Sequence, residues 1–244
     1  PQTDVKVKLT IIQSKYYKVG DLYVVNGEPL GLVYEISDGG AHGKVVALKA
    51  HRDLNLWYRT GLPYDEIHPE DPNNVGVIAR SETDGQENMK AYKQIPDWKT
   101  HYPVAAYVSD LNDENGNPGW YLPAIKEVQA MVGWIDGEVL SPDGEAGQEP
   151  SEAMKEKRKA INQLIVDNGG NEFYFYGYDV SFIIDQTNAW EADYFNRIYT
   201  STETDYQVHP MVFKFYLRNG WWETMHVYGD LAGSYGEVRP FLAF

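Results

Sequence analysis

Few residues in this chain have the types and the spacing that catalysis requires. Cysteine is absent, and neither the Gly-x-x-x-x-Gly-Lys loop that holds phosphate nor the Gly-x-Gly-x-x-Gly loop of dinucleotide sites occurs. Ser234 stands in the stretch Ala232-Gly-Ser-Tyr-Gly236, where Ala232 replaces the first glycine of a nucleophile elbow, so we expect a turn there. The six histidines form no pair at metal-ligand spacing. The sequence therefore predicts no enzyme, no cofactor and no metal site.

The acidic residues leave two alternatives open. A carboxylate pair for glycoside hydrolysis depends on a separation in space of about 5–10 Å, and the 36 acids include no pair that the sequence singles out. Asp113, Asn115 and Asn117 have the spacing of calcium ligands, but Pro118 stands where a calcium loop needs glycine. We therefore expect a simple turn between two helices at this position, and a glycoside hydrolase remains the less favoured function.

The tryptophans near the end of the chain indicate a site of another kind. Trp221 and Trp222 are adjacent on a predicted strand, so their side chains point to opposite faces of the sheet. An exposed Trp beside Glu223 would suit a sugar, because the ring contacts its apolar face and polar neighbours orient it. The alternative is a Trp covered by the long segment before the hairpin. We predict ligand contacts at six residues: Trp190, Tyr194, Tyr206, Trp222, Glu223 and Tyr228.

Strands are predicted toward both ends of the chain to position these residues. Alternation of apolar and polar residues predicts a strand over 5–12, followed by a β region over 16–25. Residues 31–48 are typical of a hairpin with a glycine-rich connection. Asn219-Gly220 predicts a second hairpin between strands 211–218 and 221–228. Further strands are expected over 173–180 and 235–244, and a long irregular segment over 55–87.

Three helices are predicted in the middle of the chain, over 103–111, 123–132 and 151–168. Pro103 and Pro123 suit the first turn of the first two helices. Ser151 suits the N-cap of the third, and Asn168-Gly169-Gly170 should end it. The basic cluster 155–159 is expected on the exposed side of that helix. Strands at both ends with helices between them predict an α+β fold.

Composition narrows the class of partner. The 244 residues carry 21 basic and 36 acidic side chains, so 21 − 36 gives a formal charge of −15. Such a charge disfavours binding to nucleic acid and to anionic membranes, because a protein that binds either of them needs clustered Lys and Arg. The chain has no apolar run long enough to span a bilayer. It begins at Pro1, which we interpret as a mature form from which a signal or lipid anchor has been removed.

Several segments, in order along the chain, resemble a known family of bacterial surface-protein domains. The segments are Tyr17-Lys-Val-Gly-Asp-Leu-Tyr23, 31–40, 42–46, Gly119-Trp-Tyr-Leu-Pro123 with the helix entry up to Val128, Tyr199-Thr-Ser-Thr-Glu203 and Val238-Arg-Pro-Phe-Leu-Ala-Phe244. They are similar to the Lcl C-terminal-domain family. That resemblance implies a C-type-lectin-like single domain, a distant relative of the formylglycine-generating sulfatase-modifying enzymes. Because those enzymes rely on cysteine, the resemblance does not extend to their activity.

The resemblance also suggests roles for individual residues and a place for the protein. Trp120 and Tyr199 should be core aromatics, and Arg239 and Glu203 should be partners across strands. We expect a C-type-lectin-like domain over 16–244, with mixed or antiparallel strands, two or three helices and long irregular loops. Residues 1–15 would form an N-terminal strand or the end of an upstream segment. The expected location is extracellular or on the outer-membrane surface.

Two functions of different classes follow from these observations. The first is a non-enzymatic adhesion or binding module at the cell surface, whose partner is a glycan or an extracellular host protein. The second is a structural subunit or accessory domain of a surface or fimbrial assembly, such as an outer-membrane lipoprotein. The N-terminal edge strand motivates the second, because an unpaired strand edge accepts a strand from another chain.

Overall fold

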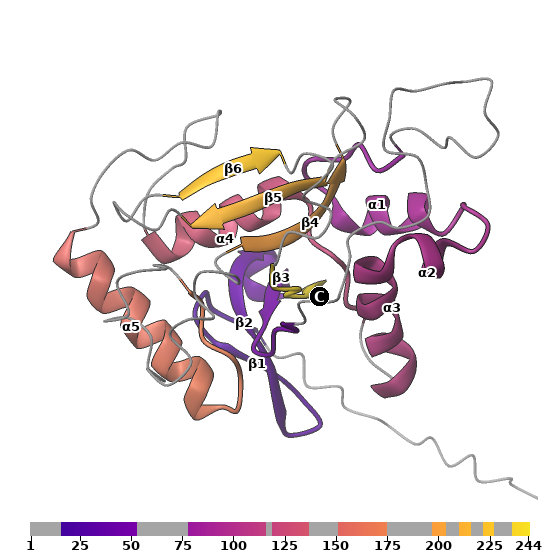
Figure 1. Cartoon of the computed structure of the whole chain (residues 1–244). Coiled ribbons are helices and arrows are strands. Elements are labelled where there is room, and N and C mark those ends of the chain that lie inside the picture. Colours follow the sequence, from indigo (N-terminus) through magenta and orange to yellow (C-terminus); the bar gives the residue numbers. More distant parts are fainter. Residues whose placement is uncertain are drawn as a thin grey trace, which may run out of the picture.

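The computed structural model describes residues 16–52, 78–115, 119–136, 151–174, 197–203, 210–215, 222–226 and 236–244, without the side chains of 113–115, 136, 210–215 and 222–226. In this part of the chain it is an α+β protein with two antiparallel sheets and five α-helices. Figure 1 shows the sheets in the middle, with α1, α2 and α3 on one side and α5 on the other. The predicted α+β class is confirmed.

The first sheet has four strands in the order β1-β2-β3-β7. Its strands are β1 (Leu22–Val25), β2 (Glu28–Ser37), β3 (His42–Ala47) and β7 (Phe241–Ala243). All neighbouring strands in it are antiparallel, so the end of the chain pairs with β3. The expected hairpin over 31–48 is confirmed as β2 and β3, and the expected last strand is shorter than predicted.

Glycine is required where β2 turns into β3. A short 3-10 helix, Asp38–Gly40, connects the two strands, and both of its glycines have positive φ. A Cβ atom on Gly40 would lie 2.1 Å from the carbonyl oxygen of Tyr17, far closer than two such atoms can approach. In addition, the Tyr17 amide donates to the Gly40 carbonyl at 3.0 Å. The segment before β1 is thereby fixed against the hairpin.

The second sheet has three strands in the order β4-β5-β6, namely β4 (Arg197–Glu203), β5 (Pro210–Phe215) and β6 (Trp222–His226). The β5–β6 pair is antiparallel, with Phe215 opposite Trp222, which confirms that the two predicted strands are neighbours; the predicted turn at Asn219-Gly220 lies outside the described residues. A parallel bridge between Ile198 and Glu237 joins this sheet to the segment before β7. The two sheets are therefore connected through the end of the chain.

The helices are α1 (Gly85–Tyr92), α2 (Trp98–His101), α3 (Pro103–Asn115), α4 (Ile125–Asp136) and α5 (Glu152–Asp167). The three predicted helices are confirmed as α3, α4 and α5, although α4 starts after Pro123. The prediction of two or three helices was wrong: α1 starts in the last residues of the segment 55–87 that was expected to be irregular, and α2 forms where no element was predicted. α3 also continues to Asn115, so residues 110–115 are helical rather than a turn.

The caps of α5 form as predicted. The Ser151 side chain accepts a hydrogen bond from the Met154 amide at 3.3 Å. After the helix, Gly169 has a φ of 75° and the Gly170 amide donates to the Ile165 carbonyl. The basic cluster is exposed at Lys157 and Lys159, as expected, but Arg158 is a correction, because it is buried with 1% of its surface exposed. Arg158 falls on the same stripe as Ile161 and Ile165, because residues three and seven apart share a helix face.

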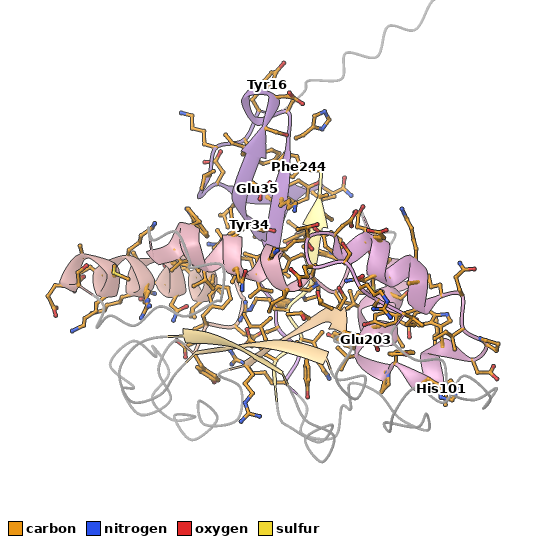
Figure 2. All side chains as sticks on the ribbon, turned by 90° about the horizontal axis from the view of Figure 1, so that it is seen from above. Tyr16, Tyr34, Glu35, His101, Glu203 and Phe244 are labelled. Atoms are coloured by element: carbon orange, nitrogen blue, oxygen red, sulfur yellow. The ribbon has the colours of Figure 1, made fainter. Side chains whose placement is uncertain are left out.

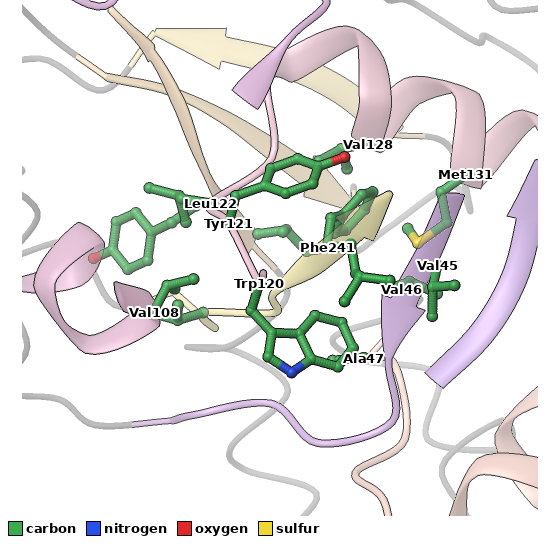
Figure 3. Close-up of a cluster of buried hydrophobic side chains, with 14 of the residues drawn as sticks. Val45, Val46, Ala47, Val108, Trp120, Tyr121, Leu122, Val128, Met131 and Phe241 are labelled. Carbon is green, nitrogen blue, oxygen red and sulfur yellow. The ribbon is translucent and has the colours of Figure 1, made fainter. Parts of the chain in front are cut away.

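The hydrophobic core lies between the two sheets and the helices. Helix α4 contacts β2, β4 and β5, and its buried residues Val128 and Met131 belong to the same cluster as Val45 and Phe241 (Figure 3). Trp120 and Tyr199 are both buried, which confirms their assignment to the core. No helix among the described residues is long and apolar enough to cross a membrane.

Arg239 is completely buried and joins three segments of the chain. Its Nε donates to Glu237 at 2.7 Å, and its remaining nitrogens donate to the carbonyls of Ala47 and Leu48 and to those of Asn171 and Glu172. The predicted partnership with Glu203 was wrong. The Glu203 carboxylate instead accepts from the amides of Ile78 and Ala79, because the end of β4 lies beside that segment, whereas the start of β4 bridges to Glu237.

Candidate functional site

The structure places few of the residues predicted to contact a ligand. Trp190, Tyr194, Tyr206 and Tyr228 lie outside the described residues, as do Ser234 and the N-terminal strand 5–12. The backbones of Trp222 and Glu223 belong to β6, where they pair with Phe215 and Lys214 of β5. The predicted site around the final hairpin stays a prediction.

A different site lies at the end of the first sheet that carries the β1–β2 turn. A pocket of about 540 Å³ opens between the β1–β2 turn, the end of β3, helix α3 and the end of α5. This volume is in the range of about 300–1,000 Å³ that small-molecule sites occupy. Its lining residues come from six separate parts of the chain: Val25, Asn26, Glu28, Pro29, Leu30, Ala47, Leu48, Lys49, Tyr107, Leu111, Trp120, Asn168, Gly169 and Pro240.

Trp120 contributes an aromatic surface to the pocket and is held firmly. The side chain of Asn112 accepts from the Trp120 amide at 2.7 Å and donates to the Trp120 carbonyl at 2.9 Å. These two bonds satisfy the backbone of Trp120 as a neighbouring strand would. The indole nitrogen points away from the labelled apolar side chains in Figure 3.

Helix α3 provides the second wall. Tyr107 and Leu111 lie one helical turn apart, so both face the pocket from the same side of the helix. The ring of Tyr107 stacks on His51, with 4.2 Å between the ring centroids. Asn112 follows Leu111 on the same helix, so the Trp120 contact and this wall share one rigid element. The aromatic part of the pocket is therefore preorganised.

The mouth of the pocket is polar. Asn26, Glu28 and Lys49 are exposed at this rim. Asn168 completes the rim at the end of α5, where its Nδ2 donates to the Leu164 carbonyl at 2.8 Å and leaves Oδ1 as the acceptor it can offer. The rim thus presents hydrogen-bond donors and acceptors above an apolar floor formed by Leu30, Leu48 and Pro240.

The β1–β2 turn fixes the position of Asn26. Asn26 has a φ of 52° and Gly27 a φ of 91°, and Val25 pairs with Glu28 across the turn. Positive φ at both central residues is the geometry of a type I′ hairpin, which Asn-Gly favours. The same dipeptide predicted the hairpin at 219–220, but the β1–β2 hairpin was not predicted, although residues 22–25 and 30–34 flank Asn26-Gly27 with apolar positions.

The described residues do not form a metal centre. No group of three or more His, Asp or Glu side chains in the described ranges could hold an ion. Asp110, at the start of the calcium-like stretch, forms an ion pair with Lys99 instead. The buried carboxylates Glu127, Glu203 and Glu237 each accept from amides, a hydroxyl or cations, and so serve the fold.

A comparison with known proteins found no family model that matches the chain, no similar curated protein and no similar solved structure.

Proposed function

We propose that the chain is a non-enzymatic binding module of a cell surface that holds part of a glycan in the pocket beside Trp120. The observation that carries this proposal is the combination of a preorganised aromatic wall, an apolar floor and a polar mouth in one cavity. A sugar ring has apolar C–H faces and a rim of hydroxyl groups, so its two kinds of surface match the two parts of the pocket. The cell-surface location rests on the resemblance to the Lcl C-terminal-domain family.

Filling the pocket tests this proposal. Leu111→Trp should place a bulky ring in the cavity, whereas Val166→Trp adds the same ring on α5, at a residue that is 37% exposed and does not line the pocket. A glycan array and saturation-transfer NMR would identify the bound sugars. We expect Leu111→Trp to weaken binding by at least about tenfold, and Val166→Trp to leave it unchanged.

The same samples test the absence of catalysis. Mass spectrometry of the bound glycan after prolonged incubation should show it intact, since a binding module releases its ligand unchanged. Hydrolysed product that disappears in the Leu111→Trp variant would contradict the non-enzymatic part of the proposal. Equal binding by Leu111→Trp and the unchanged chain would contradict the site.

The structural-subunit function has one observation in its favour. β1 is an edge strand of the first sheet, and the exposed Tyr16 precedes it at the far tip of that sheet (Figure 2). An edge strand offers unpaired backbone groups to another chain. Light scattering over a hundredfold range of protein concentration checks this function: a constant monomer mass would count against self-assembly through β1.

A further inference from the structure

We propose that the pocket selects an uncharged pyranose ring, a neutral hexose or an N-acetylated hexosamine, over rings that carry a carboxylate, a sulfate or a free amine. This inference rests on the proposed function and names the chemical class of its ligand. Three features of the described residues support it: the apolar floor, the balanced charges of the rim and the orientation of helix α5.

The floor disfavours ionic groups. Leu30, Leu48 and Pro240 offer no hydrogen bond from their side chains, and Trp120 offers one donor, its indole N–H. A charged group that leaves water for this surface loses its hydration without an equivalent partner, which costs far more than burying a C–H face. Only a ring whose buried side is uncharged can use the full depth of the pocket.

The rim carries one charge of each sign. Glu28 and Lys49 balance each other, and Asn26 and Asn168 add neutral amides. A hydroxyl group both donates and accepts, so each of these four side chains can bind one without leaving a charge unpaired. An anionic ring would gain Lys49 but face Glu28, and a cationic ring would meet the opposite problem. Neither ion finds the paired cations or carboxylates that typical charged-ligand sites provide.

The end of α5 adds a further bias against anions. Asn168 and Gly169 line the pocket just after the last residue of this 16-residue helix. The C-terminal end of a helix carries a partial negative charge that acts within about one turn. The net charge of −15 adds a long-range repulsion that also slows the approach of anionic ligands. Both effects leave an uncharged ring unaffected.

Matched glycosides separate the charge of the ring from its stereochemistry. Methyl glucoside, methyl N-acetylglucosaminide, methyl glucuronide and methyl glucosaminide share one ring configuration, and the galacto and manno series repeat the set. Saturation-transfer NMR and titration of tryptophan fluorescence would report binding to the full chain. In the series that binds, we expect the uncharged members to bind at least about tenfold more tightly than the charged ones.

Two rim variants test the origin of the selectivity. Glu28→Gln should raise the affinity for the glucuronide-type ligand, and Lys49→Gln should raise the affinity for the amine, because each removes the like charge. The matched controls are Glu35→Gln, an exposed acid on the same strand as Glu28, and Lys90→Gln on α1, and neither should change the selectivity.

The outcomes distinguish this inference from the proposed function. If a uronate, sulfated sugar or free amine binds as tightly as the uncharged ring and Leu111→Trp abolishes that binding, the ligand class is wrong while the glycan site stands. If no glycoside of any charge binds in a manner sensitive to Leu111→Trp, the proposed function itself fails.

Discussion

Asn112 shows how one polar side chain fixes the site. Its side chain bonds the backbone amide and carbonyl of Trp120, as a neighbouring strand would, through two hydrogen bonds of 2.7 and 2.9 Å. Nothing in the local sequence announces this role, since Asn112 belongs to a stretch that suggests a turn or a calcium loop. The family resemblance predicted that Trp120 is buried, but the contact that orients Trp120 appears only when α3 packs against the segment before α4.

Asn112→Ala should therefore destabilise the fold and loosen the pocket together. Each lost hydrogen bond is worth about 1 kcal/mol, so we expect the free energy of unfolding in urea to fall by about 2 kcal/mol. Asn112→Asp keeps the acceptor for the Trp120 amide but loses the donor to its carbonyl, and should show a smaller loss. Hydrogen exchange at the Trp120 amide checks the mechanism: unchanged protection in Asn112→Ala would contradict it.

Tyr34, in contrast to Asn112, buries a polar group without a hydrogen bond, which costs stability. It lies where the first sheet meets α4 (Figure 2), is 4% exposed, and its hydroxyl has no hydrogen-bond partner among the described residues. Burial raises its pKa well above the ordinary value of about 10, and Tyr121 and Glu127 raise it further. Tyr34→Phe should keep the packing and leave stability at pH 7 unchanged or slightly higher.

The raised pKa of Tyr34 also sets the sign of a pH effect. The unfolded chain releases the Tyr34 proton above about pH 10 while the folded chain keeps it, so this residue's contribution to stability is lost as the pH rises above that value. Tyr34→Phe should flatten the fall in the free energy of unfolding between about pH 9 and pH 11. An identical fall in the variant and the unchanged chain would show that Tyr34 plays no part.

At the scale of elements, residues far apart in sequence decide what local patterns cannot. The hairpins and helices α3 to α5 follow from turn residues, caps and apolar spacing, and so could be predicted. α1 could not: its buried residues include Asn88, which donates to Ser201 on β4, and Tyr92, whose hydroxyl donates to the Ser201 carbonyl. Only Met89 and Tyr92 on the buried face of α1 are large apolar residues, so the face that packs against this distant strand is hard to recognise from the sequence. The pocket was not predicted for the same reason, since its walls come from six parts of the chain that are far apart in sequence.

Glu127 joins two helices at their N-termini. Its Oε2 accepts from the Gly85 amide at the start of α1 and from the Ala124 amide before α4, at 3.0 and 2.9 Å. Its Oε1 accepts from the Tyr121 hydroxyl at 2.8 Å and pairs with Lys44 at 3.0 Å. Four donors around one buried carboxylate require an acceptor that lacks hydrogens of its own.

Glu127→Gln should consequently be costly although it is nearly isosteric. Its amide nitrogen would face donors, and we expect the free energy of unfolding to fall by about 3 kcal/mol. Glu156→Gln, an exposed position on α5, is the matched control and should change stability by less than about 0.5 kcal/mol. Equal urea midpoints for the two variants would show that Glu127 does not hold α1 against α4.

For the whole molecule, the two sheets and the pocket depend on the same connection. Arg239 donates to Ala47 and Leu48, two residues that line the pocket, and to Glu237, whose neighbour Val238 bridges to His51. Arg52 pairs with the other side of Glu237 and stacks on Tyr174, with 3.9 Å from its guanidinium carbon to the ring centroid. Arg239 and Glu237, near the end of the chain, thus hold the end of β3 and the segment after α5 together. Backbone hydrogen bonds of Glu237 with Arg197 and Tyr199 join the second sheet to them.

Arg239→Lys tests this connection. Lysine keeps the positive charge but offers one nitrogen, so it cannot reach Glu237 and the carbonyls of both neighbouring segments at once. Burial lowers the pKa of Arg239, and the neighbouring Glu237 carboxylate raises it. A lysine at this position would meet the same desolvation with fewer hydrogen-bond partners. We expect a loss of about 3–5 kcal/mol in the free energy of unfolding, the range for disrupting a buried ion pair.

Because the same carbonyls lie beside the pocket floor, sugar binding by Arg239→Lys should also weaken under conditions where the variant remains folded. A variant that unfolds at the same urea concentration as the unchanged chain would contradict a shared connection, and normal binding with reduced stability would confine Arg239 to the fold.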